Sequence, residues 1–287
     1  MLKMDPNEKR EQSDVWKNRS FPYVPMNERD PKPRTKSITE IRGPYYAPTP
    51  HTYTQELLNL MGEHVDGYKY AGGSFSLMPA EEVIKLNRIC HDHGVYVSTG
   101  GWVENVLARA PNHIDEYIEE CKRLEFDMIE LSTGFIQLPV PDLITLIQKV
   151  KKAGLKPKPE IGIQFGAGGD TSQAELEAEG TRDPQILIDT ANECLNAGAD
   201  IIMIESEGIT ENADPWRTDV AAKIMKEVGM DNVMFEAADP EVFQWYIKNY
   251  GIDVNMFIDH SQIVQLECLR RGIWGTKSTF GRITTHR

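Results

Sequence analysis

The sequence lacks the segments and motifs that define several large protein classes. In 287 residues there is no apolar run of 18 residues and no apolar segment near the N-terminus, so we expect a cytoplasmic protein that is neither secreted nor membrane-spanning. No G-x-S-x-G, P-loop or H-E-x-x-H motif occurs. Serine hydrolases of the nucleophile-elbow type, P-loop nucleotide hydrolases and zinc peptidases are therefore disfavoured.

Cysteine is scarce, and its spacing argues against metal or redox chemistry. The four cysteines fall in helical patterns without any C-x-x-C pair: Cys90, Cys121, Cys194 and Cys268. Zinc sites and dithiol redox motifs need such close pairs. We expect reduced and mostly buried thiols.

Positive charge is also in short supply. The chain has 31 Lys and Arg against 44 Asp and Glu, which gives a formal net charge of −13. The acidic residues are spread through the expected helices rather than collected in a tail. This distribution argues against nucleic acid or an anionic membrane as the main partner.

Hydrophobic periodicity divides the chain into an arm and one domain. Residues 1–36 are rich in charged residues, Asn and Pro and show no apolar period. We expect this arm to be extended or disordered unless it packs on the body, with Trp16, Phe21, Tyr23 and Val24 available for docking. Residues 37–287 are long enough for a single large α/β domain.

Short apolar strands alternate with amphipathic helices through this domain. We expect strands at residues 38–41, 67–70, 95–99, 128–131, 157–161, 201–205, 233–236 and 254–258. Eight strands in strict βα alternation predict an α/β fold of the (β/α)8 TIM-barrel type, with an open doubly wound sheet as the second choice.

One connection is too long to be routine. Residues 162–182 form a glycine-rich and acidic segment after the fifth expected strand. Loops of this length are often functional, so the segment is either a lid over the site or a flexible insertion. The sequence favours neither reading.

The residues that end the expected strands carry most of the chemistry. In a TIM barrel these positions surround the active site at one end of the barrel. They are heavily acidic, with Lys69 and Arg42 among them, and include Glu40, Glu130, Glu160, Glu205, Glu207, Glu236 and Asp259. Converging carboxylates repel one another unless cations lie among them, so we expect Mg²⁺ or these two basic side chains to balance them.

Lys69 lies in the stretch VDGYKYAGGS, just before a glycine pair. The lysine is a candidate general acid, an anion clamp or a Schiff-base nucleophile, and its alternative is a structural ion pair with Glu130 or Glu40. Backbone N–H groups of the glycine-rich turns can face a bound anion. We therefore take these residues as candidate substrate contacts: Gly72, Gly73, Ser74, Gly100 and Gly101.

The stretch Asp259-His260-Ser261 follows the last expected strand and begins the last helix. Many barrels bind phosphate at this position through helix N-terminal amides, which makes all three residues candidate substrate contacts. The alternative is that Asp259 or Ser261 only caps the helix. Arg270 and Arg271, at the far end of that helix, are expected to form salt bridges or subunit contacts, so a homo-oligomer remains compatible with the sequence.

Several stretches resemble the phosphosulfolactate synthase family, whose members add sulfite to phosphoenolpyruvate with Mg²⁺ on a TIM barrel. The resemblance extends over the chain from about residue 37 and is carried by VDGYKYAGGS, VYVSTGGWVE, FDMIELSTG, KPEIG, AGADIIMIES, VMFEA and LECLRRG. TEIRGPYY, HGVYVSTGGW, NVMFEAADPE and VNMFIDHSQIVQLECLR are similar to a divergent branch that includes plant heat-stress-associated proteins.

The resemblance implies a lyase acting on a small anionic substrate such as phosphoenolpyruvate. It assigns catalysis to Lys69, Glu130, Glu160 and Glu236, Mg²⁺ binding to Glu160 and Glu205, and substrate binding to Arg42 with the glycine turns. The plant branch implies the alternative, a non-catalytic heat-stress-associated protein that binds partners.

Two positions depart from the synthase pattern. An aspartate and a lysine after the first strand are replaced by the stretch Glu40-Ile41-Arg42-Gly43. A lysine after the fifth strand, suited to protonating an enolate, is replaced by Ile163 and Gln164. These changes leave open a related lyase or hydratase reaction.

Overall fold

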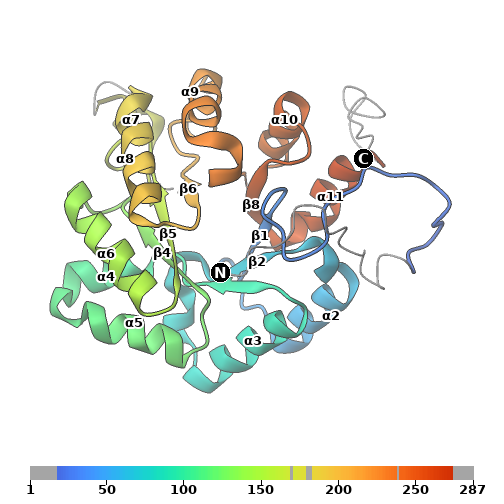
Figure 1. Cartoon of the computed structure of the whole chain (residues 1–287), viewed down its shortest axis with the longest axis horizontal. Helices are drawn as coiled ribbons and strands as arrows, with labels where there is room; N and C mark the ends of the chain where they lie inside the picture. The colour runs from blue at the N-terminus through green and yellow to red at the C-terminus, as the bar shows by residue number, and fades with distance from the viewer. Residues whose placement is uncertain (1–17, 169–170, 179–182, 238, 274–287) are drawn as a thin grey trace.

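A closed barrel of eight parallel strands forms the centre of the molecule (Figure 1). The structure is a computed structural model that describes residues 18–168, 171–178, 183–237 and 239–273. The strands follow the chain order around the barrel and are β1 Thr39–Arg42, β2 Gly67–Lys69, β3 Tyr96–Ser98, β4 Met128–Ser132, β5 Lys156–Ile161, β6 Ile202–Ile204, β7 Val233–Glu236 and β8 Asn255–Asp259. The predicted (β/α)8 TIM barrel is confirmed, with every strand within a residue or two of its expected bounds.

Helices surround the barrel on its outside (Figure 1). They are α2 His51–Met61, α3 Ala80–Asp92, α4 Trp102–Arg109, α5 Ile114–Arg123, α6 Val140–Lys152, α7 Gln173–Ala178, α8 Pro184–Ala197, α9 Thr218–Ile224, α10 Pro240–Tyr250 and α11 Ile263–Arg271. Short 3₁₀ segments lie at Gly62–His64, Ala71–Leu77, Pro111–His113, Met230–Asn232 and His260–Gln262, and a π-helical turn at Met225–Gly229.

Local sequence signals set several helix ends. The Asp183 side chain accepts a hydrogen bond from the Gln185 N–H and caps α8, whose first residue is Pro184. Asp239 does the same for α10 before Pro240. An N-cap carboxylate followed by proline satisfies free N–H groups and pre-sets the first helical turn. These residues therefore fix where α8 and α10 begin.

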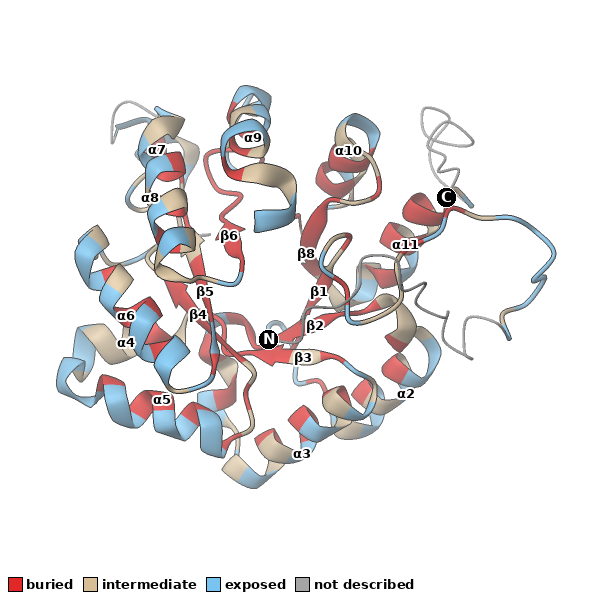
Figure 2. Ribbon diagram, viewed as in Figure 1, coloured by how far each residue is buried: buried red, intermediate tan, exposed pale blue. Residues whose placement is uncertain are grey.

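Apolar side chains pack on both sides of the strands. Residues facing out from the barrel form the large core between sheet and helices, and Figure 2 shows the buried strands inside helices whose outer faces are exposed. A smaller cluster fills part of the barrel interior and contains Met128, Ile201, Met203, Met234 and Phe257. Because strand side chains alternate between faces, residues two apart on each strand share the interior.

The segment before β1 packs under the barrel through charged groups rather than aromatic ones. Arg29 binds Glu267 of α11 at 2.5 Å, and Arg34 binds Asp66 at 2.8 Å. Phe21, Tyr23 and Val24, which the sequence left available for docking, are exposed, and Trp16 lies outside the described residues. In Figure 1 this dark-blue segment runs beside α11, consistent with the hydrogen bond from Asn27 N–H to the Arg271 carbonyl (3.1 Å).

Two further expectations concern cysteines and membrane helices. Cys90, Cys121 and Cys194 are buried free thiols, and Cys268 is half-buried. Burial raises the pKa of the Cys90 thiol to about 12, so it stays protonated at neutral pH. Among the described helices none is long and apolar enough to cross a bilayer.

Candidate active site

A pocket of about 680 Å³ opens where the strands end. Eight of the predicted site residues line it: Arg42, Lys69, Gly72, Gly101, Glu130, Glu160, Glu205 and Glu236. The strand register explains this convergence, because Arg42 lies beside Lys69 on β2 and Ser132 of β4 lies beside Glu160. Side chains at the carboxyl ends of parallel strands therefore meet in one place.

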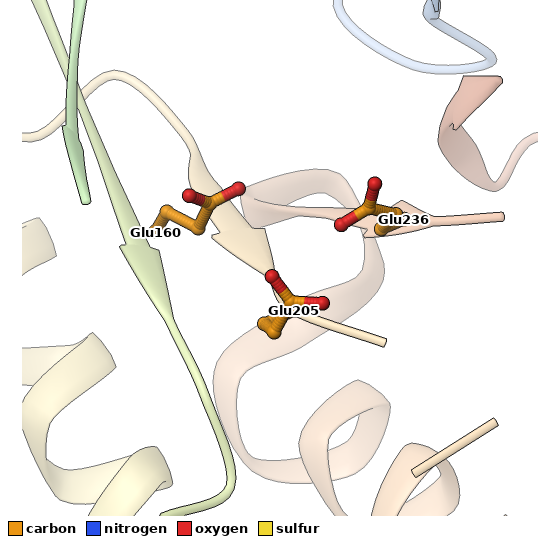
Figure 3. A group of neighbouring side chains, drawn as sticks. All are labelled: Glu160, Glu205 and Glu236. Atoms are coloured by element: carbon orange, nitrogen blue, oxygen red, sulfur yellow. The ribbon is translucent and has the colours of Figure 1, made fainter. Parts of the chain in front are cut away.

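Three carboxylates form the most compact group in this pocket. Glu160, Glu205 and Glu236 come from the ends of β5, β6 and β7, and oxygen atoms of all three lie within 4.8 Å of one another. Figure 3 shows the three side chains pointing toward a common centre. Burial and the charge of Glu130 raise the pKa of Glu160 to about 7. Burial, then Glu236 and Glu160, raise the pKa of Glu205 well above its usual range.

This group fits a hard divalent cation. All of its donors are carboxylate oxygens, which Mg²⁺ and Mn²⁺ prefer. In the described part of the chain no lysine or arginine forms an ion pair with Glu205, whose Oε1 accepts the Glu207 N–H at 3.1 Å. A buried carboxylate without a counterion is costly, and a bound cation removes that cost. Glu236 joins the two residues predicted as metal ligands.

Lys69 lies between two of the predicted carboxylates. Its Nζ is 2.8 Å from Glu130 Oε1 and 3.0 Å from Glu160 Oε1, and it sits over the Phe257 ring at 4.5 Å. Burial lowers the pKa of Lys69, but the charges of Glu130, Glu160 and Glu236 outweigh burial and hold the pKa well above its usual value. The amine is therefore a cation at neutral pH, which suits anion binding and argues against a Schiff-base nucleophile.

Lys158 is a buried residue that the sequence reasoning missed. Its Nζ bridges Glu40 Oε1 (2.5 Å) and Glu130 Oε2 (3.0 Å) inside the barrel. Burial raises the pKa of Glu130, but the positive charges of Lys158 and then Lys69 lower it by more than burial raises it. The pKa of Glu130 therefore lies below its usual value. Lys158 precedes Glu160 by two residues on β5, and that spacing alone places both side chains in the interior.

The structure thus separates the predicted carboxylates by role. Glu40 is fully buried with Lys158 and does not line the pocket. Glu207 accepts backbone N–H bonds from Gly168 (2.8 Å) and Thr171 (2.6 Å) and so holds the β5–α7 connection. Arg42 donates to Glu236 Oε1 at 3.1 Å.

The glycine turns are only partly available to a ligand. Gly72 has a φ of 57° and open space where a Cβ would stand, and it lines the pocket with Gly101. Gly100 does not line it. This glycine is needed for close packing, since a Cβ there would lie 2.0 Å from the Tyr70 carbonyl oxygen. Gly73 is likewise needed for close packing, because a Cβ there would clash with the Trp102 side chain. Ser74 donates its hydroxyl to the Pro44 carbonyl (2.8 Å), so Gly73, Ser74 and Gly100 take structural positions.

The stretch after β8 acts as a helix cap. Asp259 accepts hydrogen bonds from the Ser261 N–H (2.9 Å) and hydroxyl (2.6 Å), and with Gln262 it completes a capping box. His260 donates its Nδ1–H to the Arg42 carbonyl at 3.0 Å. None of the three lines the described pocket. The structural alternative considered for Asp259 therefore accounts for its observed contacts.

The predicted loop after β5 contains a helix, α7. Residues 169–170 and 179–182 of this loop lie outside the described residues. Ile163 is buried, and Gln164 donates to the Leu176 carbonyl at 2.8 Å. At the position where the resemblance places the synthases' lysine, Ile163 packs in the core, Gln164 binds α7, and neither side chain lines the pocket.

The remaining pocket wall comes from residues that the sequence did not single out. Tyr45 and Tyr46 follow β1, Asn105 and Arg109 belong to α4, and Phe135 with Ile136 follows β4. Glu104 on α4 is buried and accepts the Phe135 N–H at 2.8 Å. Its place in the first turn of a helix after Gly100-Gly101 was the available signal.

A closed parallel (β/α)8 barrel with a charged pocket at the carboxyl ends of its strands places this chain among the TIM-barrel proteins. The model of one family, (2R)-phospho-3-sulfolactate synthase (ComA), matches residues 27–276. The chain belongs to that family.

Similar proteins come from both expected branches. Protein HEAT-STRESS-ASSOCIATED 32 of Arabidopsis thaliana is 40% identical over 265 residues, covering 89% of this chain and 91% of the relative. A phosphosulfolactate synthase of Methanocaldococcus jannaschii is 24% identical over 245 residues, covering 82% and 91%. A crystal structure of 2,3-dimethylmalate lyase, 12% identical with a TM-score of 0.50 over 80% of this chain and 78% of that one, shares the fold.

Proposed function

We propose that the chain is a phosphosulfolactate-synthase-like lyase that uses a divalent cation, Mg²⁺, to handle an enolate of a small phosphorylated or carboxylated acid. One observation carries the proposal: Glu160, Glu205 and Glu236 converge within 4.8 Å beside the cationic Lys69. Acidic oxygens and a fixed ammonium group together suit an anion whose charge increases during reaction.

The chain's own residues divide this work. Glu160, Glu205 and Glu236 would hold the cation, which when bound stabilises negative charge on carboxylate and enolate oxygens. Lys69, fixed by Glu130 and Glu160, attracts the substrate anion and favours the more negative transition state. Arg42 adds a second cation next to it. Both are preorganised by ion pairs and so need little rearrangement.

In the parent reaction sulfite adds to the methylene carbon of phosphoenolpyruvate. A carbon–sulfur bond forms, the electron pair of the double bond moves toward the carboxylate, and C2 then takes a proton. Lys69 is a poor proton donor because its pKa is held well above the usual value. With Ile163 buried in the core and Gln164 bound to α7, a related lyase reaction needing no acid at that position fits these residues as well.

The non-catalytic alternative is less well supported. It draws on the name of the 40% identical plant relative. A protein that only bound partners through its surface would gain nothing from three converging, mutually repelling carboxylates, which lower stability when unpaired. Their retention favours chemistry.

The assay combines the protein with Mg²⁺, sulfite and phosphoenolpyruvate and follows sulfonate by mass spectrometry. A parallel reaction in D₂O follows metal-dependent exchange of the pyruvate methyl protons, which reports enolate formation without sulfite. We expect one or both signals from the unmodified protein, reduced about 100-fold or more in Lys69→Ala, since fixed charges at a developing anion contribute on this scale.

Lys69→Ala leaves Glu160 without its lysine and Glu130 with Lys158 alone, so Glu205→Gln serves as a second variant with less effect on folding. Circular dichroism establishes that both variants are folded. Absence of both sulfonate and methyl exchange in the unmodified protein would rule out the proposed enolate chemistry.

A further inference from the structure

The pocket is larger than a three-carbon acid requires. Its volume of about 680 Å³ lies within the range of roughly 300–1,000 Å³ found for sites that enclose drug-sized ligands. The carboxylates and Lys69 occupy only its floor, where the strands end. The rest is bounded by residues that we call the outer wall: Tyr45, Tyr46, Asn105, Arg109, Phe135 and Ile136.

Aromatic rings dominate the outer wall and are left exposed there. Tyr46 is 84% exposed and Phe135 is 62% exposed, although both line the cavity. Large rings in a concave site gain free energy when a ligand covers them. Tyr45 links this region to the floor, because its ring contacts Tyr46 edge-on at 4.5 Å and lies under the Arg42 guanidinium at 4.8 Å.

Phe135 is held in place from behind by a buried carboxylate. Glu104 Oε1 accepts the N–H groups of Phe135 (2.8 Å) and Ile136 (3.2 Å), and its Oε2 accepts the Ser132 hydroxyl (3.3 Å). These bonds fix the start of the β4–α6 loop against α4. A ring on such a restrained loop loses little conformational entropy when a ligand contacts it.

We propose that the substrate is a 2-oxo acid, or its enol form, that carries a planar apolar group on C3, and that this group lies against Tyr46 and Phe135. The inference rests on the proposed function, which places the acid end at the carboxylate-bound cation and Lys69. Asn105 and Arg109 lie on the same wall and offer N–H donors to a polar substituent of that group.

The test compares two probes on Mn²⁺-loaded protein: pyruvate, and phenylpyruvate as its C3-aryl analogue. Mn²⁺ broadens the ligand proton signals in NMR, so titration gives a Kd for each acid. We expect phenylpyruvate to bind about tenfold tighter or more, since aromatic contacts and ring burial contribute on this scale.

Single substitutions of the aromatic residues show which rings produce the tighter binding of phenylpyruvate. Tyr46→Ala and Phe135→Ala should each remove most of the phenylpyruvate advantage. Phe165→Ala should keep it, because Phe165 is also an exposed ring on a neighbouring loop but does not line the cavity.

The outcomes separate this inference from the proposed function. Equal affinity for both acids, or an advantage that survives in both Tyr46→Ala and Phe135→Ala, overturns the inference while leaving the enolate proposal in place. Failure of both acids to bind, with or without bound Mn²⁺, overturns both. A ratio of phenylpyruvate affinity to pyruvate affinity that falls in Tyr46→Ala and Phe135→Ala but not in Phe165→Ala supports the proposed substrate class.

Discussion

At the floor of the pocket, two buried lysines share one carboxylate. Lys69 and Lys158 pair with opposite oxygens of Glu130, at 2.8 and 3.0 Å, and Lys158 also pairs with Glu40. This arrangement leaves Lys69 charged and directed toward the cavity. The charges of Glu130 and Glu160 beside the amine therefore help to keep Lys69, the group that would contact substrate, in its cationic form.

Replacing Lys158 with methionine should destabilise the fold strongly. Glu40 and Glu130 would then lie buried without their shared counterion, at a cost of about 3–5 kcal/mol. Urea unfolding measures the difference. Lys156→Met is the matched control, because Lys156 is the exposed lysine two residues earlier on β5, and it should change stability by less than about 1 kcal/mol.

A double variant, Lys158→Met with Glu40→Gln, tests the charge argument itself. Removing one carboxylate along with the lysine should recover part of the lost stability. An equal loss in the single and double variants would point to packing rather than charge.

Lys158 also shows where residue-level reasoning stopped short. The strand-end residues Glu130, Glu160 and Glu236 could be found because the fold fixes where strand ends meet. Finding Lys158 would have required applying the two-residue alternation of strand side chains to the position on β5 that precedes Glu160 on the same face. Gly73 and Gly100 were misleading for a different reason, because a glycine needed for close packing and one that faces a ligand look alike in sequence.

Among the elements, the buried Glu207 side chain helps to bind the connection between β5 and α7 to the neighbouring loop. Glu207 accepts two backbone N–H bonds from this connection, at Gly168 and Thr171, and a side-chain N–H bond from Asn212 at 3.0 Å. Gly168 also lines the pocket. The position of this wall therefore depends on Glu207.

Glu207→Gln should loosen the connection without unfolding the barrel. An amide keeps one acceptor oxygen, so at least one bond is lost, at a cost of about 1–3 kcal/mol. Hydrogen exchange at the Gly168 and Thr171 amides should accelerate by roughly tenfold or more. Glu175→Gln, which alters an exposed cap on the same segment, should leave these rates unchanged, and equal protection in both variants would contradict the assignment.

The elements themselves were largely predictable, whereas their connections were not. The eight strands and their helices follow from the period of the apolar residues and from helix caps such as Asp239-Pro240. The helix α7 inside the expected loop was missed, since its six residues are too few to show a period. The burial of Ile163 in the core and the bond of Gln164 to α7 depend on tertiary contacts that no local pattern encodes.

At the scale of the whole molecule, a buried ionic network joins the N-terminal segment to the last helix under the barrel. Arg29 binds Glu267 at 2.5 Å and Asp66 at 3.4 Å, and Arg271 binds Glu267 at 2.6 Å. Burial raises the pKa of Glu267, but Arg29 and His64 outweigh burial and hold the pKa well below its usual range. The network therefore depends on an ionised Glu267.

This pKa shift predicts acid sensitivity. A carboxyl whose pKa is lower in the folded state stabilises the fold fully above its unfolded pKa of about 4.3, and that stability is lost as pH falls below it. Glu267→Gln should lower stability at pH 7 by about 3–5 kcal/mol and flatten the dependence below pH 5. Unfolding midpoints between pH 3 and 7 measure both.

Replacing a surface pair provides the comparison. Lys36→Met breaks the partly exposed pair with Asp253 (3.0 Å) and should cost less than about 1 kcal/mol. A Glu267→Gln protein with an unchanged acid profile would contradict the assigned role of the network.

We propose that Glu160, Glu205 and Glu236 form a divalent-cation site at the pocket floor. Electron paramagnetic resonance of Mn²⁺ across pH 5.5–8.5 measures the affinity of this site. Because the pKa of Glu160 is raised to about 7, protons compete with the cation, so affinity should fall as pH drops below about 7. Glu205→Gln should weaken binding at least tenfold, whereas Glu211→Gln, on the same pocket wall, should not. Absence of Mn²⁺ binding, or binding equally strong in Glu205→Gln, would contradict the claim.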